Sequence, residues 1–181
     1  TEGYSINLDG IDLISFYGLP DDNSISAVME GIGVESVMGA SNAANFDGTD
    51  WTGSLLELDL SSGYWVRATG STLTGSGFPY NIAREYSLNE GFNLVSFPSK
   101  GSFDISGALP DDIEDNIIAI IGEGASAINN GQWIGSLDEF EGDRGYWIFT
   151  DAAISFSYDL SGESSSAREV ASAQVTEQPE G

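Results

Sequence analysis

The sequence predicts a mainly β protein, of α+β type, made of two tandem copies of a small sandwich- or barrel-like unit with one short helix each. Three observations predict this class: repeated motifs, strand-like alternation of apolar and polar residues, and a composition rich in turn-forming residues. Of 181 residues, 40% are hydrophobic, 11% are aromatic and 23 are glycine. This apolar content is enough to form a core. Many glycines favour short strands and turns over long helices.

An internal repeat is the strongest signal in the sequence. Three blocks recur in the same order, each 81 or 82 residues later: Gly10–Phe16 as Gly91–Phe97, Trp51–Leu58 as Trp133–Phe140, and Gly63–Val66 as Gly145–Ile148. The repeat predicts a first unit over residues 1–76 and a second over residues 77–160. The turn-rich stretch Gly75–Pro79 is expected to link them. Residues 161–181 are small and polar and predict a C-terminal tail.

Each unit is expected to begin with two strands. Tyr4–Leu8 alternates apolar and polar side chains, as a half-buried strand does. Asp9-Gly10 favours a turn, so a hairpin with a second strand over Ile11–Tyr17 is expected. Asp22 or Ser24 can then cap a short helix that ends near Glu30.

The second copy predicts a similar helix at Ile105–Leu109, which Pro110 ends. A buried strand follows in each copy, at Ser36–Met38 and at Asn116–Ile121. The Trp-x-Gly-Ser-Leu segment, the Gly-Tyr-Trp strand and a closing strand complete each unit. The closing strands are expected at residues 71–74 and 153–158.

Charge and missing residue types exclude several classes of function. There are 29 acidic and 5 basic residues, giving a net charge of −24, with no histidine and no cysteine. Nucleic-acid binding and attraction to an anionic membrane both need clustered basic residues. Disulfides, Cys/His metal sites and His-based triads lack their side chains. No apolar run approaches the roughly 18 residues of a membrane span, so membrane insertion is not expected.

The motifs resemble a known group of repeats. Gly91–Phe97, Ile121–Ser126, Gln132–Leu137 and Gly145–Trp147 together are similar to repeats in large secreted or surface proteins of marine bacteria and in structural proteins of cyanobacterial viruses. The first copy departs from the pattern at Gly10-Ile11-Asp12. The resemblance implies an extracellular or virion-surface role and transfers no catalytic residue. A strongly acidic surface also keeps chains solvated and apart in salty water.

Aromatic residues of the repeated blocks are the candidate binding residues. A ring exposed to solvent could stack on a sugar, whereas a buried ring would be a core anchor, and duplication of the positions favours the core. In the Gly-Tyr-Trp strand, Tyr and Trp point to opposite faces, so one ring of each pair is expected to be exposed. The candidates for a carbohydrate site are Trp51, Trp65, Trp133, Trp147, Tyr64 and Tyr146.

A calcium site is a further candidate. Asp47 and Asp50 lie in the segment Asn45–Asp50, and oxygen-rich loops can bind Ca²⁺. The second copy has Asn129-Asn130-Gly131 at the corresponding place, without a carboxylate. Turn chemistry explains both copies, whereas calcium explains one of them.

Catalysis would have to rest on carboxylates, and Glu57/Glu139 is the duplicated acid. One acid in each unit is weak support for a hydrolase, so we expect a non-enzymatic structural or surface protein. It would be an outward-facing module of a virion or extracellular assembly, held by packing against other subunits through sheet edges or the C-terminal tail. The alternative is a carbohydrate-binding or adhesion module that uses exposed aromatic side chains.

Overall fold

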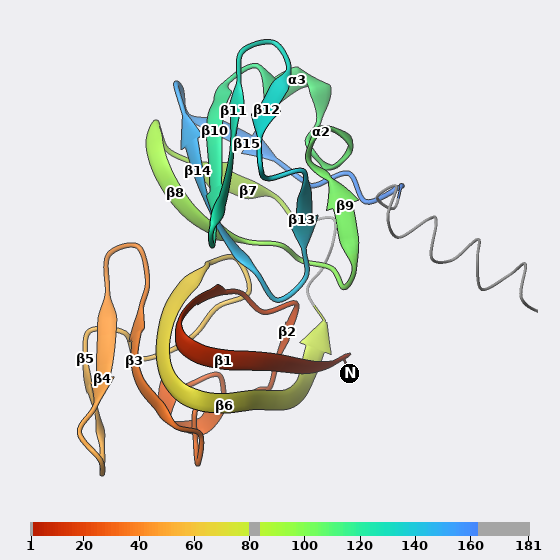
Figure 1. Ribbon diagram of the computed structural model, residues 1–181. Coiled ribbons are helices and arrows are strands. Elements are labelled where there is room, and N and C mark those ends of the chain that lie inside the picture. The colour runs from red at the N-terminus through yellow and green to blue at the C-terminus, as the bar shows by residue number, and fades with distance from the viewer. Residues whose placement is uncertain (1, 80–83, 163–181) are drawn as a thin grey trace, which may run out of the picture.

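A computed structural model describes residues 2–79 and 84–162, and its fold is mainly β, as the sequence predicts. We call residues 2–79 the first unit and residues 84–162 the second unit. The two units stack one above the other in Figure 1. The predicted tail lies outside the described residues, apart from Ser161 and Gly162. Within the described part of the chain, no helix is long and apolar enough to cross a membrane.

Long curved strands dominate the first unit. Its elements are β1 (Glu2–Ile14), β2 (Gly18–Leu19), α1 (Ile25–Val28), β3 (Val34–Met38), β4 (Ala43–Phe46), β5 (Trp51–Gly53) and β6 (Tyr64–Pro79). The sheet has the order β1-β6-β3-β4-β5, and β2 also pairs with β6. Helix α1 begins where predicted, because the Ser24 hydroxyl accepts a hydrogen bond from the backbone N–H of Ala27 (3.3 Å).

The second unit has shorter strands. Its elements are β7 (Tyr86–Leu88), β8 (Gly91–Ser96), β9 (Ser102–Asp104), α2 (Ile105–Ala108), α3 (Asp111–Glu114), β10 (Ile117–Gly122), β11 (Ala125–Asn129), β12 (Trp133–Gly135), β13 (Glu139–Glu141), β14 (Gly145–Thr150) and β15 (Ile154–Phe156). The main sheet has the order β12-β11-β10-β14-β8. Two-stranded sheets β13-β9 and β15-β7 complete the unit.

The repeated blocks occupy corresponding strands in the two main sheets. The strand that begins with the Trp-x-Gly-Ser-Leu motif lies at one edge of each sheet, as β5 and as β12. The Gly-Tyr-Trp motif lies in β6 and in β14, next to the strand that holds the Gly10 or the Gly91 block. Positions that align in sequence can therefore be compared between the sheets. The origin of the two units by duplication stays a prediction.

The predicted hairpin at Asp9-Gly10 is wrong. Strand β1 runs without reversal from Glu2 to Ile14, and β6 pairs with it on both sides of Gly10. Leu8 pairs with Ser71, but Gly10 pairs with Ala68, so the register shifts between them. Gly10 has a φ of 82° and Gly70 a φ of 52°. Such glycines allow a β-bulge, which bends the strand pair instead of turning the chain back.

Two other details also differ from the predictions. Gly75–Pro79 is not a linker but the end of β6, where Gly75 pairs with Tyr4 and Phe78 pairs with Leu19. The predicted boundary between residues 76 and 77 therefore falls inside a strand. The second unit has two short helices rather than one, because α3 begins directly after Pro110, the residue expected to end the helical segment.

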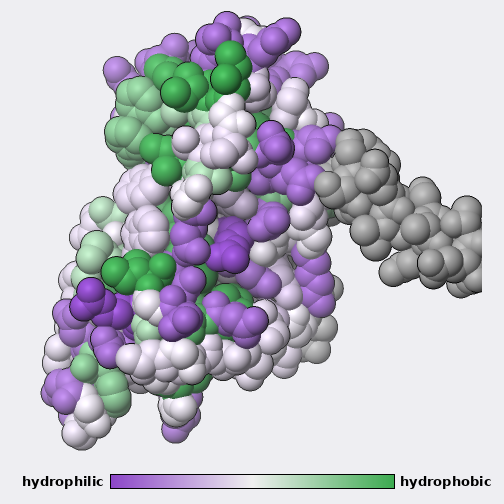
Figure 2. Space-filling view, viewed as in Figure 1, coloured by the Kyte–Doolittle hydropathy of each residue, from purple (hydrophilic) through white to green (hydrophobic). Residues whose placement is uncertain are grey.

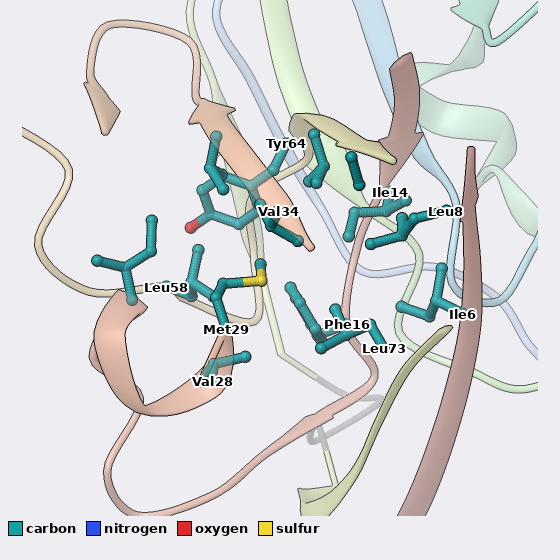
Figure 3. Close-up of a cluster of buried hydrophobic side chains, with 14 of the residues drawn as sticks. Ile6, Leu8, Ile14, Phe16, Val28, Met29, Val34, Leu58, Tyr64 and Leu73 are labelled. Atoms are coloured by element: carbon teal, nitrogen blue, oxygen red, sulfur yellow. The ribbon is translucent and has the colours of Figure 1, made fainter. Parts of the chain in front are cut away.

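Each unit has its own hydrophobic cluster. Ile6, Leu8, Phe16 and Leu73 of the first cluster point toward one another between β1, β6 and α1 (Figure 3). The second cluster centres on Phe97, whose ring stacks on that of Phe140 with centroids 5.4 Å apart. Leu60 packs against both clusters.

The contact between the units, which we call the junction, is reciprocal. The backbone N–H of Ser15 donates to the carbonyl of Asp143 (3.0 Å), and that of Ser96 donates to the carbonyl of Ser61 (3.0 Å). Ser15 aligns with Ser96 in the repeat, and Ser61 aligns with Asp143. Isolated β-bridges join Ile14 to Arg144 and Val95 to Ser62. In the repeat, Ile14 aligns with Val95, and Ser62 aligns with Arg144. Each unit therefore offers the other the same set of backbone groups.

Candidate functional site

The Trp-x-Gly-Ser-Leu motif has a structural role in both units. Gly53 and Gly135 have φ values of 132° and 145° and lie directly against the carbonyls of Ala43 and Ser126. The next residues, Ser54 and Ser136, accept hydrogen bonds through their hydroxyls from the backbone N–H groups of those same two residues (3.2 and 3.3 Å).

These serine hydroxyls therefore hold adjacent strands together. The leucine of the motif also anchors the segment, because the N–H of Leu55 donates to Ala43 and that of Leu137 donates to Ser126 (both 3.0 Å).

The tyrosines of the Gly-Tyr-Trp motif are core residues. Tyr64 and Tyr146 are each 2% exposed, so neither ring face is open to a sugar. Their hydroxyls accept hydrogen bonds from the backbone N–H groups of Asp59 (2.8 Å) and Glu141 (2.7 Å), respectively. Burial and then the nearby Asp59 carboxylate raise the pKa of Tyr64 to about 12. Burial also raises the pKa of Tyr146.

The four tryptophans are half-buried. Trp51 packs against the first hydrophobic cluster and Trp133 against the second. Trp65 and Trp147 lie on the face of their strands opposite to the buried tyrosines, as the alternation in the sequence predicts. The structure therefore divides the six aromatic candidates: two are core residues and four are partly accessible.

The candidate calcium residues lie in a turn closed by their own hydrogen bonds. One carboxylate oxygen of Asp47 accepts from the backbone N–H groups of Thr49 and Asp50 (both 2.8 Å). These bonds lower the pKa of Asp47. Among residues 2–79 and 84–162, no group of three or more acidic side chains is placed to hold a metal ion. Turn formation thus accounts for the Asp47–Asp50 segment.

Glu57 and Glu139, the duplicated acid, lie one in each unit, and Glu139 lines an open hollow together with Asp138 and Glu141. Glu57 is exposed and forms a β-bridge with Ser24. Glu139 lies in β13 and pairs with Asp104 in β9.

A feature that the sequence analysis missed lies on the outer face of the second sheet. One residue from each of the five strands lines up across this sheet, and the register of the strands joins neighbours directly. We call this set the apolar row: Phe92 (β8), Phe149 (β14), Ala119 (β10), Ile128 (β11) and Ile134 (β12). Phe92, Ile128 and Ile134 are 60%, 58% and 57% exposed. Figure 2 shows hydrophobic residues gathered on the upper unit, which contains this sheet.

Aromatic contacts extend the apolar row. The rings of Phe92 and Phe149 stack with centroids 4.6 Å apart. Trp147 meets Phe92 edge-on at 6.2 Å, and Ile121 pairs with Trp147 on the neighbouring strand. An uncharged surface thus crosses the full width of the sheet.

The first sheet has a polar row at the aligned positions. Its register joins, strand by strand, Ile11 (β1), Arg67 (β6), Ser36 (β3), Asn45 (β4) and Thr52 (β5). The same architecture therefore accepts polar side chains at four of these five positions. The same strand order thus forms in the first sheet without an apolar row, and the strand order by itself does not explain the exposed apolar side chains of the second sheet. The pairing of the strands matches Asn45 and Thr52 with Ile128 and Ile134, so the contrast becomes visible once the register is known.

Asp143 is an unusual residue at the junction. It has a φ of 69°, and its buried Oδ1 atom accepts no hydrogen bond. Burial raises the pKa of Asp143 to about 6, although Arg144 and Lys100 oppose this change. The folded chain thus binds this proton more tightly than the unfolded chain, whose carboxyl has an ordinary pKa of 3.8. Stability from this site is greatest below that value, falls as the pH rises to about 6, and stays low above it.

We expect Asp143→Asn to stabilise the protein by about 1 kcal/mol at pH 7.5, after allowing for partial exposure of the side chain. Asparagine removes the charge and tolerates a positive φ. Urea unfolding at pH 7.5 and at pH 3.5 measures the effect, which should disappear at the lower pH. An equal gain at both pH values would contradict the role of ionisation.

Comparison with protein-family models, curated proteins and solved structures finds no match to this chain. The candidate site is thus defined by the geometry of the described residues.

Proposed function

We propose that this protein is a non-enzymatic structural module that packs against a second copy of itself through the outer face of the second sheet. The observation that supports this function most directly is the contrast between the apolar row and its polar counterpart. Flat apolar faces of β-sheets pack on one another readily. The polar residues of the repeated motifs, in contrast, already bond to backbone groups, as Ser54, Ser136, Tyr64 and Tyr146 show.

The size of this face predicts a weak contact. Five strands about 4.8 Å apart, with an average length of about 17 Å, give a face of roughly 400 Å². A stable pair of proteins buries about 800 Å² on each partner. One such contact is therefore transient, whereas many copies displayed on one assembly can bind through the sum of their contacts. The proposed setting is an extracellular or virion surface, where the module faces outward.

Charge makes the contact depend on salt. Each copy has a net charge of −24, so two copies repel one another at long range. Salt screens this repulsion, with a Debye length of about 8 Å at 0.15 M and about 3 Å at 1 M. The residues of the apolar row are uncharged, so salt does not weaken the contact that they make. Self-association is therefore expected to strengthen as salt concentration rises.

Sedimentation equilibrium at 0.15 M and 0.6 M NaCl tests the proposal. We expect measurable self-association at the higher salt concentration. The double variant Ile128→Asn/Ile134→Thr should associate at least tenfold more weakly, because it replaces two apolar side chains of the apolar row with polar ones. Asparagine and threonine occupy the aligned positions of the first unit, so the fold should tolerate them.

Leu56→Asn is the matched control, since Leu56 is exposed but lies outside this face. A monomer at both salt concentrations, or equal weakening in the control, would contradict the proposal. A chain that ends at residue 162 tests the predicted contribution of the tail. Association through the sheet face should persist in that chain.

A further inference from the structure

An open hollow lies beside Trp51 in the first unit, remote in sequence from the apolar row. Its volume is about 440 Å³, within the usual range of about 300 to 1,000 Å³ for small-molecule sites. Its lining is mixed and includes Ser26, Met29, Glu30, Ile32, Phe46 and Trp51. A second hollow, of about 280 Å³, is also lined by Trp51, together with Ile25, Asp50 and Leu55. Trp51 thus borders open space in two places.

In the second unit a hydrogen bond holds the aligned tryptophan. The indole Nε1 of Trp133 donates a hydrogen bond to the Glu114 carboxylate of α3. Asn129, which aligns with Phe46 in the pairing of the strands, donates through its side-chain amide to the carbonyls of Glu114 (3.0 Å) and Ile117 (3.1 Å). Helix α3 and its neighbours thus hold Trp133 and Asn129 in place.

A difference in chain length explains why the first unit stays open. Ile25 begins α1 and Val34 begins β3, whereas Ile105 begins α2 and Ile117 begins β10. The second connection is three residues longer, and these extra residues allow α3 to form. The first unit has no helix between α1 and β3, so Trp51 has no counterpart of the contact between Trp133 and α3.

The lining of the hollow combines aromatic rings with polar groups. The rings of Phe46 and Trp51 lie 5.4 Å apart at an angle of 37°, and Phe46 is 39% exposed. Thr49 also lines the hollow, and its backbone N–H is held by Asp47 (2.8 Å). The hydroxyls of Ser26 and Thr49 and the carboxylate of Glu30 can exchange hydrogen bonds with a polar ligand.

We propose that this hollow binds a neutral saccharide of one or two rings. The C–H face of a pyranose is apolar and packs on an indole ring, while its hydroxyls require donors and acceptors such as those that line the hollow. Acidic sugars are disfavoured by the net charge of −24 and by Glu30 within the site. A single ring in an open site should bind with a dissociation constant on the order of 1 mM.

Fluorine NMR of protein labelled with 5-fluorotryptophan gives a direct test. The four signals are assigned by replacing each tryptophan in turn with phenylalanine. Titration with glucose, galactose, mannose and N-acetylglucosamine, and with disaccharides that contain them, should shift the Trp51 signal for at least one sugar. The Trp133 signal is the internal control and should stay unchanged. Glucuronic acid should shift no signal.

Phe46→Asn is the variant that tests the site without removing the reporter. Asparagine occupies the aligned position 129, so the exchange keeps a residue that the fold accepts. We expect at least a fivefold weaker affinity in this variant. The proposal is overturned if no neutral sugar moves the Trp51 signal, if the shift occurs at Trp147 or Trp133 instead, or if Phe46→Asn binds as the parent does. This test is independent of self-association, because it uses the monomer at 0.15 M salt.

Discussion

Replacing Gly135 by alanine is expected to destabilise the protein by about 3 kcal/mol or more. The φ of 145° at Gly135 disfavours any residue with a Cβ atom, at a cost of about 1 to 3 kcal/mol. An added Cβ would also lie 2.2 Å from the carbonyl oxygen of Ser126, which belongs to a paired strand and cannot move aside cheaply. Urea unfolding followed by circular dichroism measures the loss of stability.

Other glycines of the same chain provide controls for this prediction. Gly53→Ala should cost about as much, because its Cβ would lie 2.3 Å from the carbonyl oxygen of Ala43. Gly48 has a φ of 102° but no atom within 4 Å of the added Cβ, so Gly48→Ala should cost only the backbone strain of about 1 to 2 kcal/mol. If Gly135→Ala were no worse than Gly48→Ala, the proposed steric conflict would be wrong.

Replacing Gly145 by alanine should weaken the junction, so that the two units unfold less cooperatively. Its added Cβ would lie 2.7 Å from the carbonyl oxygen of Ile14 and 3.2 Å from the Cα of Gly63, both across the junction. The two chains must then move apart, and the reciprocal hydrogen bonds of Ser15 and Ser96 are expected to weaken. We expect a loss of about 2 to 3 kcal/mol and a broadened or split thermal transition.

Differential scanning calorimetry measures this second effect. Gly3→Ala is the control, since its Cβ would meet its nearest neighbour at an ordinary 3.8 Å, and it should change stability by less than about 0.5 kcal/mol. A single sharp transition for Gly145→Ala at the midpoint of the parent protein would contradict the predicted steric conflict at the junction.

Much of the fold could be predicted because the repeated motifs report local requirements. Glycine at 53 and 135 is dictated by backbone geometry, and Ser24 gave the start of α1 through its capping hydroxyl. The alternation of Tyr64 and Trp65 correctly placed one ring inside and the other outside. Such signals act over a few residues and are therefore visible in the sequence.

The incorrect predictions have a shared physical cause, which is that distant partners decided the outcome. Asp9-Gly10 favours a turn, yet β6 pairs on both sides of it and makes a bulge instead. Gly75–Pro79 has the composition of a linker, but β1 and β2 provide hydrogen-bonding partners that make it a strand. The apolar row was missed because its five residues come from five strands and become neighbours through register alone.

The candidate binding residues were only partly predictable for the same reason. Trp51 and Trp133 occupy equivalent places in the repeat, and the motif alone does not distinguish them. The difference between them arises outside the motif, where a connection that is three residues longer contains α3, whose Glu114 accepts a hydrogen bond from Trp133.

The reciprocal form of the junction limits how such units can multiply. A contact in which each member gives the other the same groups has two-fold character, and it is saturated once two members have met. A third unit joined to either end of this chain would find the groups around Ser15 and Ser96 already engaged. A longer polypeptide of these units would therefore be organised as successive pairs rather than as an even row of beads. Each unit can pair in this way with one other unit, and any larger array has to grow from the surfaces that the pairing leaves free.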